Sequence, residues 1–362
     1  MIELIFGTYG SGKTREIFSR IERDFKENKK SFLIIPDQEA VQFERLSLEL
    51  LDAKAQLSLE ILSFSRLYNR VCREYGGLSY SYVTKPMRAL LMWKTLRDLA
   101  PLLQEFVQRS SDTNMTDLML ATVNEFKASG INPANLELAS KKLPEDSALK
   151  KRLYDLALIY ACFDNFISEK YSDSADDLSK LSDILSTQDF FKGANVYIDS
   201  FTSFTSVQHK IIESMFKQAD NVSITLPLAS ADDNRICTES ITRALKLLRR
   251  SAERYGGVSE ITLSENRRAS SLPLAYLSKN LWKLDAAPMN VDKSDNSIVC
   301  EICSNPYAEC EAVAAHIRKL LREGARARDI VVIMRDPQKY EGIIDSALAN
   351  ADIPFFFASL HR

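Results

Sequence analysis

The 362-residue sequence lacks the features that mark a membrane protein or a secreted protein. It has no apolar run approaching the roughly 18 residues that a spanning helix needs, and its N-terminus does not resemble a signal peptide. An excess of charge is also missing, because 47 Lys and Arg face 49 Asp and Glu and leave a net charge of −2. Any contact with nucleic acid must therefore come from a local patch. We expect a cytoplasmic protein without a membrane partner.

Cysteine is sparse, and its spacing does not predict a disulfide framework or a metal site. Cys300 and Cys303 form a C-x-x-C pair, but no second pair lies at ligand spacing. The segment 297–303 that contains them has the apolar pattern of a buried strand. We interpret both thiols as small apolar residues of that strand.

The length and the 45% hydrophobic content suffice for two or three domains. In residues 1–76, β-rich runs alternate with helical stretches, which predicts a parallel, doubly wound α/β sheet. Residues 77–187 have helical periodicity almost throughout and predict an all-helical insertion. Strands resume in residues 188–296 and are expected to complete the first sheet.

Residues 297–362 are expected to begin a second sheet domain. The pattern predicts strands at 297–303 and 330–334, a helix at 309–322 and a further helix from Tyr340. These strands are too few to close a core, so we expect a truncated domain.

The most informative motif is a phosphate-binding loop at residues 7–14, Gly-Thr-Tyr-Gly-Ser-Gly-Lys-Thr, which matches G-x-x-x-x-G-K-[ST]. It directly follows the predicted strand 2–6, which is the context that the motif requires. Lys13 is expected to reach the β- and γ-phosphates, and Thr14 to bind Mg²⁺ at a helix N-terminus. ATP and Mg²⁺ are thus the predicted cofactors, and the predicted nucleotide-binding residues of the loop are Gly7, Gly10, Ser11, Gly12, Lys13 and Thr14.

A second apolar strand ends at Asp199, where P-loop NTPases place the carboxylate that holds Mg²⁺. In helicases the next residue is usually a glutamate that activates the attacking water, but here it is Ser200. A serine cannot take up a proton as a carboxylate does, so we expect slow or absent hydrolysis and assign no catalytic residue. Two alternatives remain open: Asp199 only caps the following turn, or a carboxylate from elsewhere acts as the base.

Residues 197–208, Tyr-Ile-Asp-Ser-Phe-Thr-Ser-Phe-Thr-Ser-Val-Gln, resemble the degenerate Walker B region of AddB (RexB-like), one of the two proteins of bacterial AddAB helicase-nucleases. Segments 35–38, 62–67, 328–335 and 353–356 match the same family in order. The resemblance implies an inactivated, UvrD-like superfamily 1 helicase: a P-loop NTPase (RecA-like) parallel sheet with a helical insertion and the start of a second RecA-like domain.

The same resemblance implies a place in an ATP-dependent helicase/exonuclease (deoxyribonuclease) complex that processes double-strand breaks for recombinational repair. The partners it implies are an AddA-type subunit, in a heterodimer, and the single strand of a duplex end, which AddB proteins scan for Chi. The nuclease and iron–sulphur regions of the family lie outside this sequence, so none of the six cysteines is assigned to the cluster.

Against UvrD-type helicases, two motifs are degraded. Residues 199–203 keep only the first carboxylate of Asp-Glu-x-Gln-Asp, and no Gly-Asp-x-x-Gln follows Leu226. Residues 263–268, Leu-Ser-Glu-Asn-Arg-Arg, resemble Leu-x-x-Asn-Tyr-Arg and make Arg268 a candidate phosphate contact; a solvated basic pair is the alternative. The resemblance therefore implies nucleotide binding without efficient motor work.

Two loops contain residue types suited to single-stranded DNA. Phe64 is a candidate stacking platform and Arg66 a candidate phosphate contact, in a loop with Ser63 that corresponds to the Thr-Phe-His segment of helicases. Pro36 and Gln38 follow another strand and complete the predicted DNA-binding set. The alternative for Phe64 is a core aromatic.

Two other classes of function remain open. Many small-molecule kinases begin with a similar phosphate loop, although this helical insertion is larger than a substrate lid usually needs and no Arg-rich lid segment is evident. The other class is a non-enzymatic scaffold protein whose loop binds no nucleotide.

Overall fold

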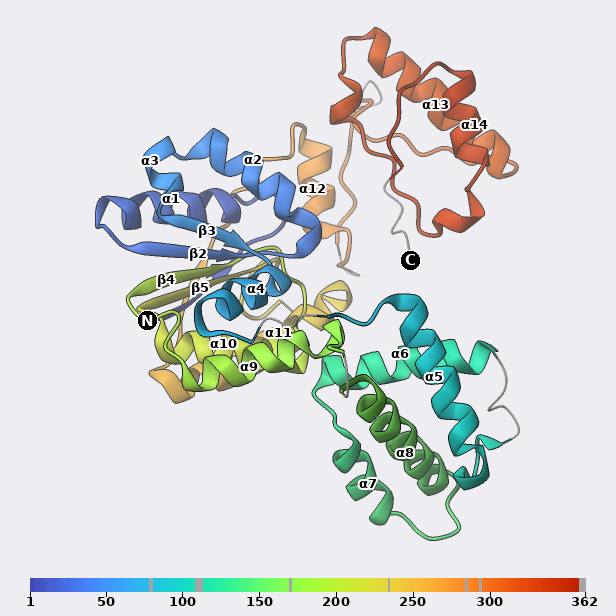
Figure 1. The fold of residues 1–362 in the computed structure, drawn as a ribbon. Helices are drawn as coiled ribbons and strands as arrows, with labels where there is room; N and C mark the ends of the chain where they lie inside the picture. Colours follow the sequence, from blue (N-terminus) through green and yellow to red (C-terminus); the bar gives the residue numbers. More distant parts are fainter. Residues whose placement is uncertain are drawn as a thin grey trace. The chain divides into compact units, whose positions relative to one another are not determined.

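The computed structural model describes residues 1–77, 81–107, 113–168, 171–233, 235–283, 286–292 and 295–357. The chain forms two compact units, Met1–Ala287 and Pro288–Arg362, which are described separately below (Figure 1). Among the described residues, no helix is long and apolar enough to cross a bilayer.

The first unit is built on a six-stranded sheet in which every neighbouring pair of strands is parallel. Its spatial order is β3-β2-β4-β5-β1-β6. The predicted α/β class and parallel sheet are thus confirmed. The strands are β1 (Ile2–Phe6), β2 (Lys30–Ile34), β3 (Leu59–Leu62), β4 (Ala194–Ile198), β5 (Asn221–Leu226) and β6 (Ser259–Thr262), of which β6 was not expected.

Helices cover both faces of this sheet (Figure 1). One face carries α1 (Lys13–Lys26), α2 (Ala40–Leu50) and α3 (Ala53–Gln56). The other face carries α4 (Phe64–Tyr75), α9 (Asp177–Thr187), α10 (Ser206–Gln218) and α11 (Glu239–Ala252). A further helix, α12 (Leu272–Asn280), follows β6.

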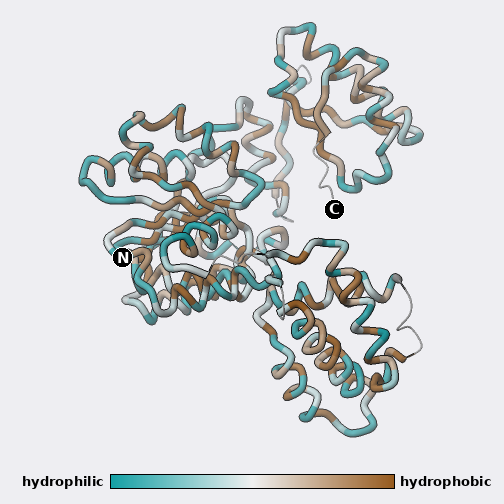
Figure 2. Tube along the Cα trace, in the orientation of Figure 1, coloured by the Kyte–Doolittle hydropathy of each residue, from teal (hydrophilic) through white to brown (hydrophobic). Residues whose placement is uncertain are grey.

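Alternation along the strands divides the interior of this unit into two cores. Leu33 packs with Phe18 and Phe43 on the α1–α3 side, whereas its neighbour Phe32 packs with Phe191 on the opposite side. This is the period of two that a strand imposes, and it explains why β2 is buried on both faces. The strands are accordingly the most apolar segments of the unit, drawn in brown in Figure 2.

The insertion is formed by α5 (Lys85–Leu99), α6 (Thr113–Ser129), α7 (Pro133–Lys141) and α8 (Ala148–Ser168). These helices enclose a core of their own that includes Met92, Leu96 and Phe163. The sequence assigned α9 to the insertion as well, but Leu181 and Leu185 of α9 belong to the core of the sheet. The helical pattern of α9 could not reveal which core its apolar side chains join.

The second unit contains α13 (Pro306–Arg322) and α14 (Ile343–Asn350), which pack through Cys310, Ile317 and Leu348. The strands predicted at 297–303 and 330–334 are wrong for this structure, because neither segment joins a described β-ladder. The expected burial is also wrong, since Cys300 is exposed. A segment with strand propensity forms a strand only where a neighbour pairs with its backbone.

Candidate nucleotide and DNA site

The loop between β1 and α1 packs so tightly that its glycines are sterically required. Gly10 and Gly12 have φ angles of +86° and +90°, in the left-handed region that side chains disfavour. A Cβ added to Gly10 would lie 2.7 Å from Cβ of Arg268, and one added to Gly7 would lie 2.2 Å from Oγ of Ser11. The backbone is thus arranged as a close-fitting cradle.

Two polar side chains of the cradle indicate that it is built for a ligand. Oγ of Ser11 is buried and has no hydrogen-bond partner among the described residues, which is unusual for a buried polar atom. Nζ of Lys13 donates to the carbonyl oxygens of Gly7 and Thr8 over 2.7 and 3.0 Å. A cation and an unsatisfied hydroxyl beside a glycine turn fit a phosphate group.

The charge environment of Lys13 brings Asp199 and Arg268 into the same site. Burial lowers the pKa of the Lys13 ammonium, the Asp199 carboxylate raises it, and the Arg268 guanidinium lowers it further. The net pKa of Lys13 lies below its usual value. Both predicted partners therefore lie near enough to Lys13 to act on its charge.

Asp199 follows β4 and is held by donors from three directions. Oγ1 of Thr14 donates to its Oδ2 over 2.7 Å, and the backbone N–H of Ser200 donates to its Oδ1 over 2.8 Å. The hydroxyl of Thr225, at the end of β5, also donates to Oδ1. The carboxylate caps the turn, as the alternative supposed, and at the same time contacts the Mg²⁺-binding residue predicted in the loop. Thr225 was missed because no motif marks it.

Ser200 occupies the position where helicases have their glutamate. Its φ angle is +68°, in the left-handed region that residues with a Cβ rarely adopt. The chain thus turns sharply directly after Asp199, and the residue at the turn has no carboxylate.

The segment after β6 lies directly on the phosphate loop. Leu263 N–H donates to the carbonyl oxygen of Phe6, and Arg267 N–H donates to that of Gly10, over 2.8 and 2.9 Å. Oδ1 of Asn266 accepts from the backbone N–H of Arg268 over 3.0 Å and fixes the turn. The structure thus brings Arg268 to the cradle, as the sequence predicted for a phosphate contact.

The two loops predicted to bind DNA lie side by side, because they follow the neighbouring strands β2 and β3. Oγ of Ser65 donates to Oδ1 of Asp37 over 2.5 Å and joins them. Ser63 is buried and caps α4, since its Oγ accepts from the N–H of Arg66. The Arg66 side chain is exposed and pairs with Glu44 over 2.6 Å.

Phe64 is not presented to solvent in this arrangement. Its side chain is only 4% exposed, and its ring packs edge-on against Phe201 with centroids 5.5 Å apart. The structure favours the interpretation of Phe64 as a core aromatic. Gln38 is exposed and Pro36 is half-buried, so both are accessible at the end of β2.

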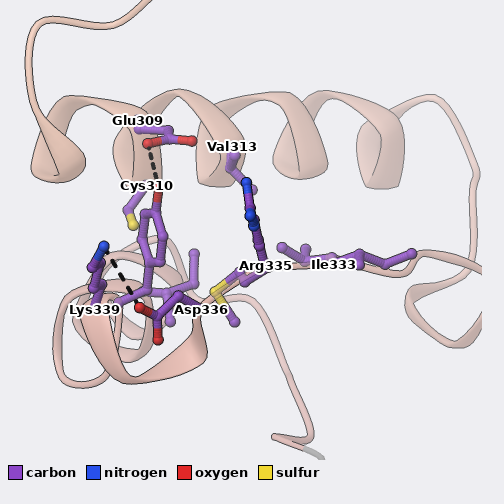
Figure 3. Close-up of a pocket in the computed structure, with 11 residues that line it drawn as sticks. Glu309, Cys310, Val313, Ile333, Arg335, Asp336 and Lys339 are labelled. Carbon is purple, nitrogen blue, oxygen red and sulfur yellow. Dashed lines mark hydrogen bonds and ion pairs between the residues drawn. The ribbon is translucent and has the colours of Figure 1, made fainter.

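The second unit has a pocket of about 380 Å³ between α13 and residues 332–336 (Figure 3). The polar groups in it satisfy one another: the Tyr340 hydroxyl donates to Glu309 over 2.9 Å, and Lys339 pairs with Asp336 over 3.6 Å. We assign no function to this pocket.

A parallel α/β sheet with a glycine cradle, a lysine and a buried aspartate at one edge defines the class of fold, and comparison with known proteins gives the family. The family model described as the N-terminal region of AddB matches residues 4–278. The chain therefore belongs to the AddB family.

Its relatives are named as the B-type component of an ATP-dependent helicase/deoxyribonuclease. The relative from Acetivibrio thermocellus is 30% identical over 368 residues, which cover 98% of this chain and 32% of the relative. The one from Caldanaerobacter subterraneus is 31% identical over 366 residues, which cover 98% of this chain and 31% of the relative. The chain thus spans about a third of the length of these relatives.

Proposed function

We propose that this chain is the helicase-like part of an AddB-type helicase/deoxyribonuclease protein, binds ATP and single-stranded DNA, and acts in the processing of double-strand breaks. Its sheet is then a RecA-like core, and its partner is an AddA-type protein in a cytoplasmic heterodimer. The observation that carries the proposal is the unsatisfied Ser11 hydroxyl in a glycine cradle beside Lys13. Family membership supports it, since the relatives are named as ATP-dependent.

The residues present fit Mg·ATP. Gly7, Gly10 and Gly12 leave room for the backbone to surround the phosphates, while Lys13 and Arg268 supply positive charge. Thr14 and Asp199 are the candidate Mg²⁺ ligands, and their mutual hydrogen bond already holds both oxygens at one place. The metal, when bound, would neutralise phosphate charge.

We propose further that hydrolysis is weak or absent. Ser200 has no group that can take a proton from water, and its left-handed backbone is a conformation that a longer side chain would also adopt with strain. ATP then acts as a bound ligand that stabilises this domain rather than as a fuel.

Single-stranded DNA is proposed to cross the loops that follow β2 and β3. Gln38, Ser65 and Arg66 are exposed there. The Arg66–Glu44 pair is a surface ion pair, worth about 0–1 kcal/mol, so Arg66 can exchange its carboxylate partner for a DNA phosphate. Phe64 supports this loop from the core.

Calorimetry with Mg·ATP tests the nucleotide site. We expect binding by the wild-type chain, loss of binding in Lys13→Ala, and no change in Lys141→Ala, which removes an exposed lysine on α7. At 100 times its dissociation constant the nucleotide should add about 2.7 kcal/mol to stability. Wild-type chain that takes up no Mg·ATP would refute the proposal and leave a scaffold, whereas brisk release of ADP would refute weak hydrolysis.

Fluorescence anisotropy with a labelled single strand tests the DNA path. Arg66→Ala should weaken binding by about 10-fold if it contacts a phosphate. Arg45→Ala is the matched control, because Arg45 on α2 is also exposed and also pairs with a glutamate, Glu49. Equal affinity of the wild type and Arg66→Ala would remove this loop from the path.

A further inference from the structure

Arg267 stands where the related helicase motif has a tyrosine, and the structure places it on the phosphate loop. A Cβ added to Gly12 would lie 3.5 Å from Cζ and Nη1 of Arg267 and 3.6 Å from its Cδ. Its backbone N–H donates to the carbonyl oxygen of Gly10 over 2.9 Å. The guanidinium therefore lies along the glycine that directly precedes Lys13.

The charges around the cradle leave Arg267 available for a ligand. Asp199 is engaged by Thr14 and Thr225, so it does not neutralise Arg267. Among the described residues, the ion pair of Arg267 is with Glu265, at 3.0 Å, and the two side chains are 53% and 72% exposed. Such an exposed pair is weak.

A phosphate is a better partner for this guanidinium than the exposed glutamate. Arginine presents a planar fork of N–H donors that matches phosphate oxygens and forms two parallel hydrogen bonds with them. An independent sign of a missing ligand lies in the same loop, where the buried Oγ of Ser11 has no partner in the described part of the chain. An anion in the cradle would meet the unsatisfied hydroxyl and the guanidinium together.

We propose that Arg267 is a phosphate ligand of the nucleotide site, and that Glu265 holds it beside the cradle until a nucleoside triphosphate binds and replaces the carboxylate. This proposal rests on the proposed nucleotide binding. It gives Arg267 the role of a phosphate contact, where a tyrosine could contribute only its ring and one hydroxyl group. Glu265 then acts as a competitor that lowers affinity.

Titration calorimetry with two probes tests the role of Arg267. Mg·ATP and magnesium tripolyphosphate share the phosphates, but only ATP has a base on which a guanidinium could stack. Arg267→Gln should weaken both by about 10-fold, and Arg267→Lys, which keeps the charge without the fork, should lie between it and the wild type. A loss confined to ATP would overturn the proposal in favour of base stacking, and unchanged binding of both probes would overturn it altogether.

The role of Glu265 is tested by a double-mutant cycle. Glu265→Gln should tighten both probes by a few-fold, and this gain should vanish in the Arg267→Gln background. The controls are Arg243→Gln and Glu239→Gln, which break a similarly exposed pair with the same 3.0 Å separation on α11. A gain that persists without Arg267 would overturn the competition.

Failure of this proposal can be told apart from failure of the nucleotide site itself. If the wild type binds Mg·ATP and Lys13→Ala does not, the site is sound, and an unaffected Arg267→Gln then refutes only the role of Arg267. If neither the wild type nor any variant binds either probe, both proposals fall. Because Arg267 is half-exposed, thermal melts of the variants should match that of the wild type.

Discussion

Oγ1 of Thr14 donates a 2.7 Å hydrogen bond to Oδ2 of Asp199, although the two residues are separated by 185 positions in the sequence. The bond joins the N-terminus of α1 to the C-terminal end of β4. Asp199 is only 2% exposed, so its carboxylate depends on fixed donors for the hydrogen bonds that water would otherwise supply. The arrangement holds two candidate metal ligands together before any metal arrives.

Replacing Thr225 by valine tests the support of Asp199 from β5. Thr225 is 1% exposed, and valine fills nearly the same space but cannot donate to Oδ1. We expect a loss of about 1 kcal/mol in urea unfolding and weaker Mg·ATP binding. Thr95→Val is the control, since Thr95 is equally buried and donates to a backbone carbonyl in the insertion. It should lower stability without changing nucleotide affinity; the same affinity loss in both variants would contradict the prediction.

Replacing Gly10 by alanine tests the close contact between the phosphate loop and Arg268. Gly256→Ala isolates the backbone effect, because Gly256 has a φ of +102° and no described atom within 4 Å of an added Cβ. It should cost about 1–2 kcal/mol of unfolding free energy. Gly10→Ala suffers the same kind of strain and also places its Cβ 2.7 Å from Cβ of Arg268, so it should cost more and abolish nucleotide binding. Equal costs would show that the segment after β6 yields easily.

The features that the sequence predicted well are those coded by adjacent residues. The loop at 7–14 and the aspartate at the end of β4 are local motifs, and strand and loop positions suffice to find them. The parallel arrangement also followed, because strands alternate with helices along the chain. Arg268 was found only through its resemblance to a longer motif.

Contacts across strands could not be predicted in the same way. Thr225 meets Asp199 because β4 and β5 are neighbours in space, and nothing in the sequence around Thr225 marks it. Phe64 shows a different limit, since an aromatic residue after a strand has the same pattern whether it stacks on a base or packs on Phe201. Its burial had to be seen.

The second unit shows a third limit. The apolar pattern of residues 330–334 predicts a strand, yet Ile333 is 89% exposed and Val331 76% exposed in the structure. Strand propensity describes a segment that fits a pleated, half-buried surface, and the outcome depends on the neighbours that supply that surface.

Replacing Lys127 tests a buried ion cluster in the helical insertion. Lys127 is 4% exposed and pairs with Asp164, Asp173 and Asp176 at 2.8, 3.0 and 2.8 Å. Burial lowers its pKa, but the three carboxylates raise it above the usual value, so the ammonium stays charged. Lys127→Met should cost about 3–5 kcal/mol because it leaves these carboxylates without their cation.

The matched control for that variant is Lys141→Met, which breaks a surface pair with Glu137 on α7. A surface pair of this kind should cost about 0.5 kcal/mol or less. Urea unfolding followed by circular dichroism measures both variants. A cost for Lys127→Met as small as that of the control would mean that the three carboxylates find water or protons instead.

His209 on α10 gives this fold a dependence on pH that can be worked out in sign. Its Nε2 lies 2.8 Å from Oγ of Ser251 on α11. Burial lowers the pKa of His209, the Glu213 carboxylate raises it, and Arg254 lowers it again, with a net shift downward. A histidine whose pKa is lowered by folding contributes full stability above the unfolded value of about 6.5. That stability is lost as the pH falls through the folded pKa.

We therefore expect the wild type to lose unfolding free energy between about pH 7.5 and pH 5.5, a window that lies above the titration of ordinary carboxyl groups. His209→Gln removes the titrating ring and should flatten this profile. His316→Gln, which changes an exposed histidine on α13, should leave it unchanged. Because folding favours neutral His209, protonation must break the packing between α10 and α11 or draw Glu213 closer. A profile that stays equally steep in His209→Gln would place the titration elsewhere in the molecule.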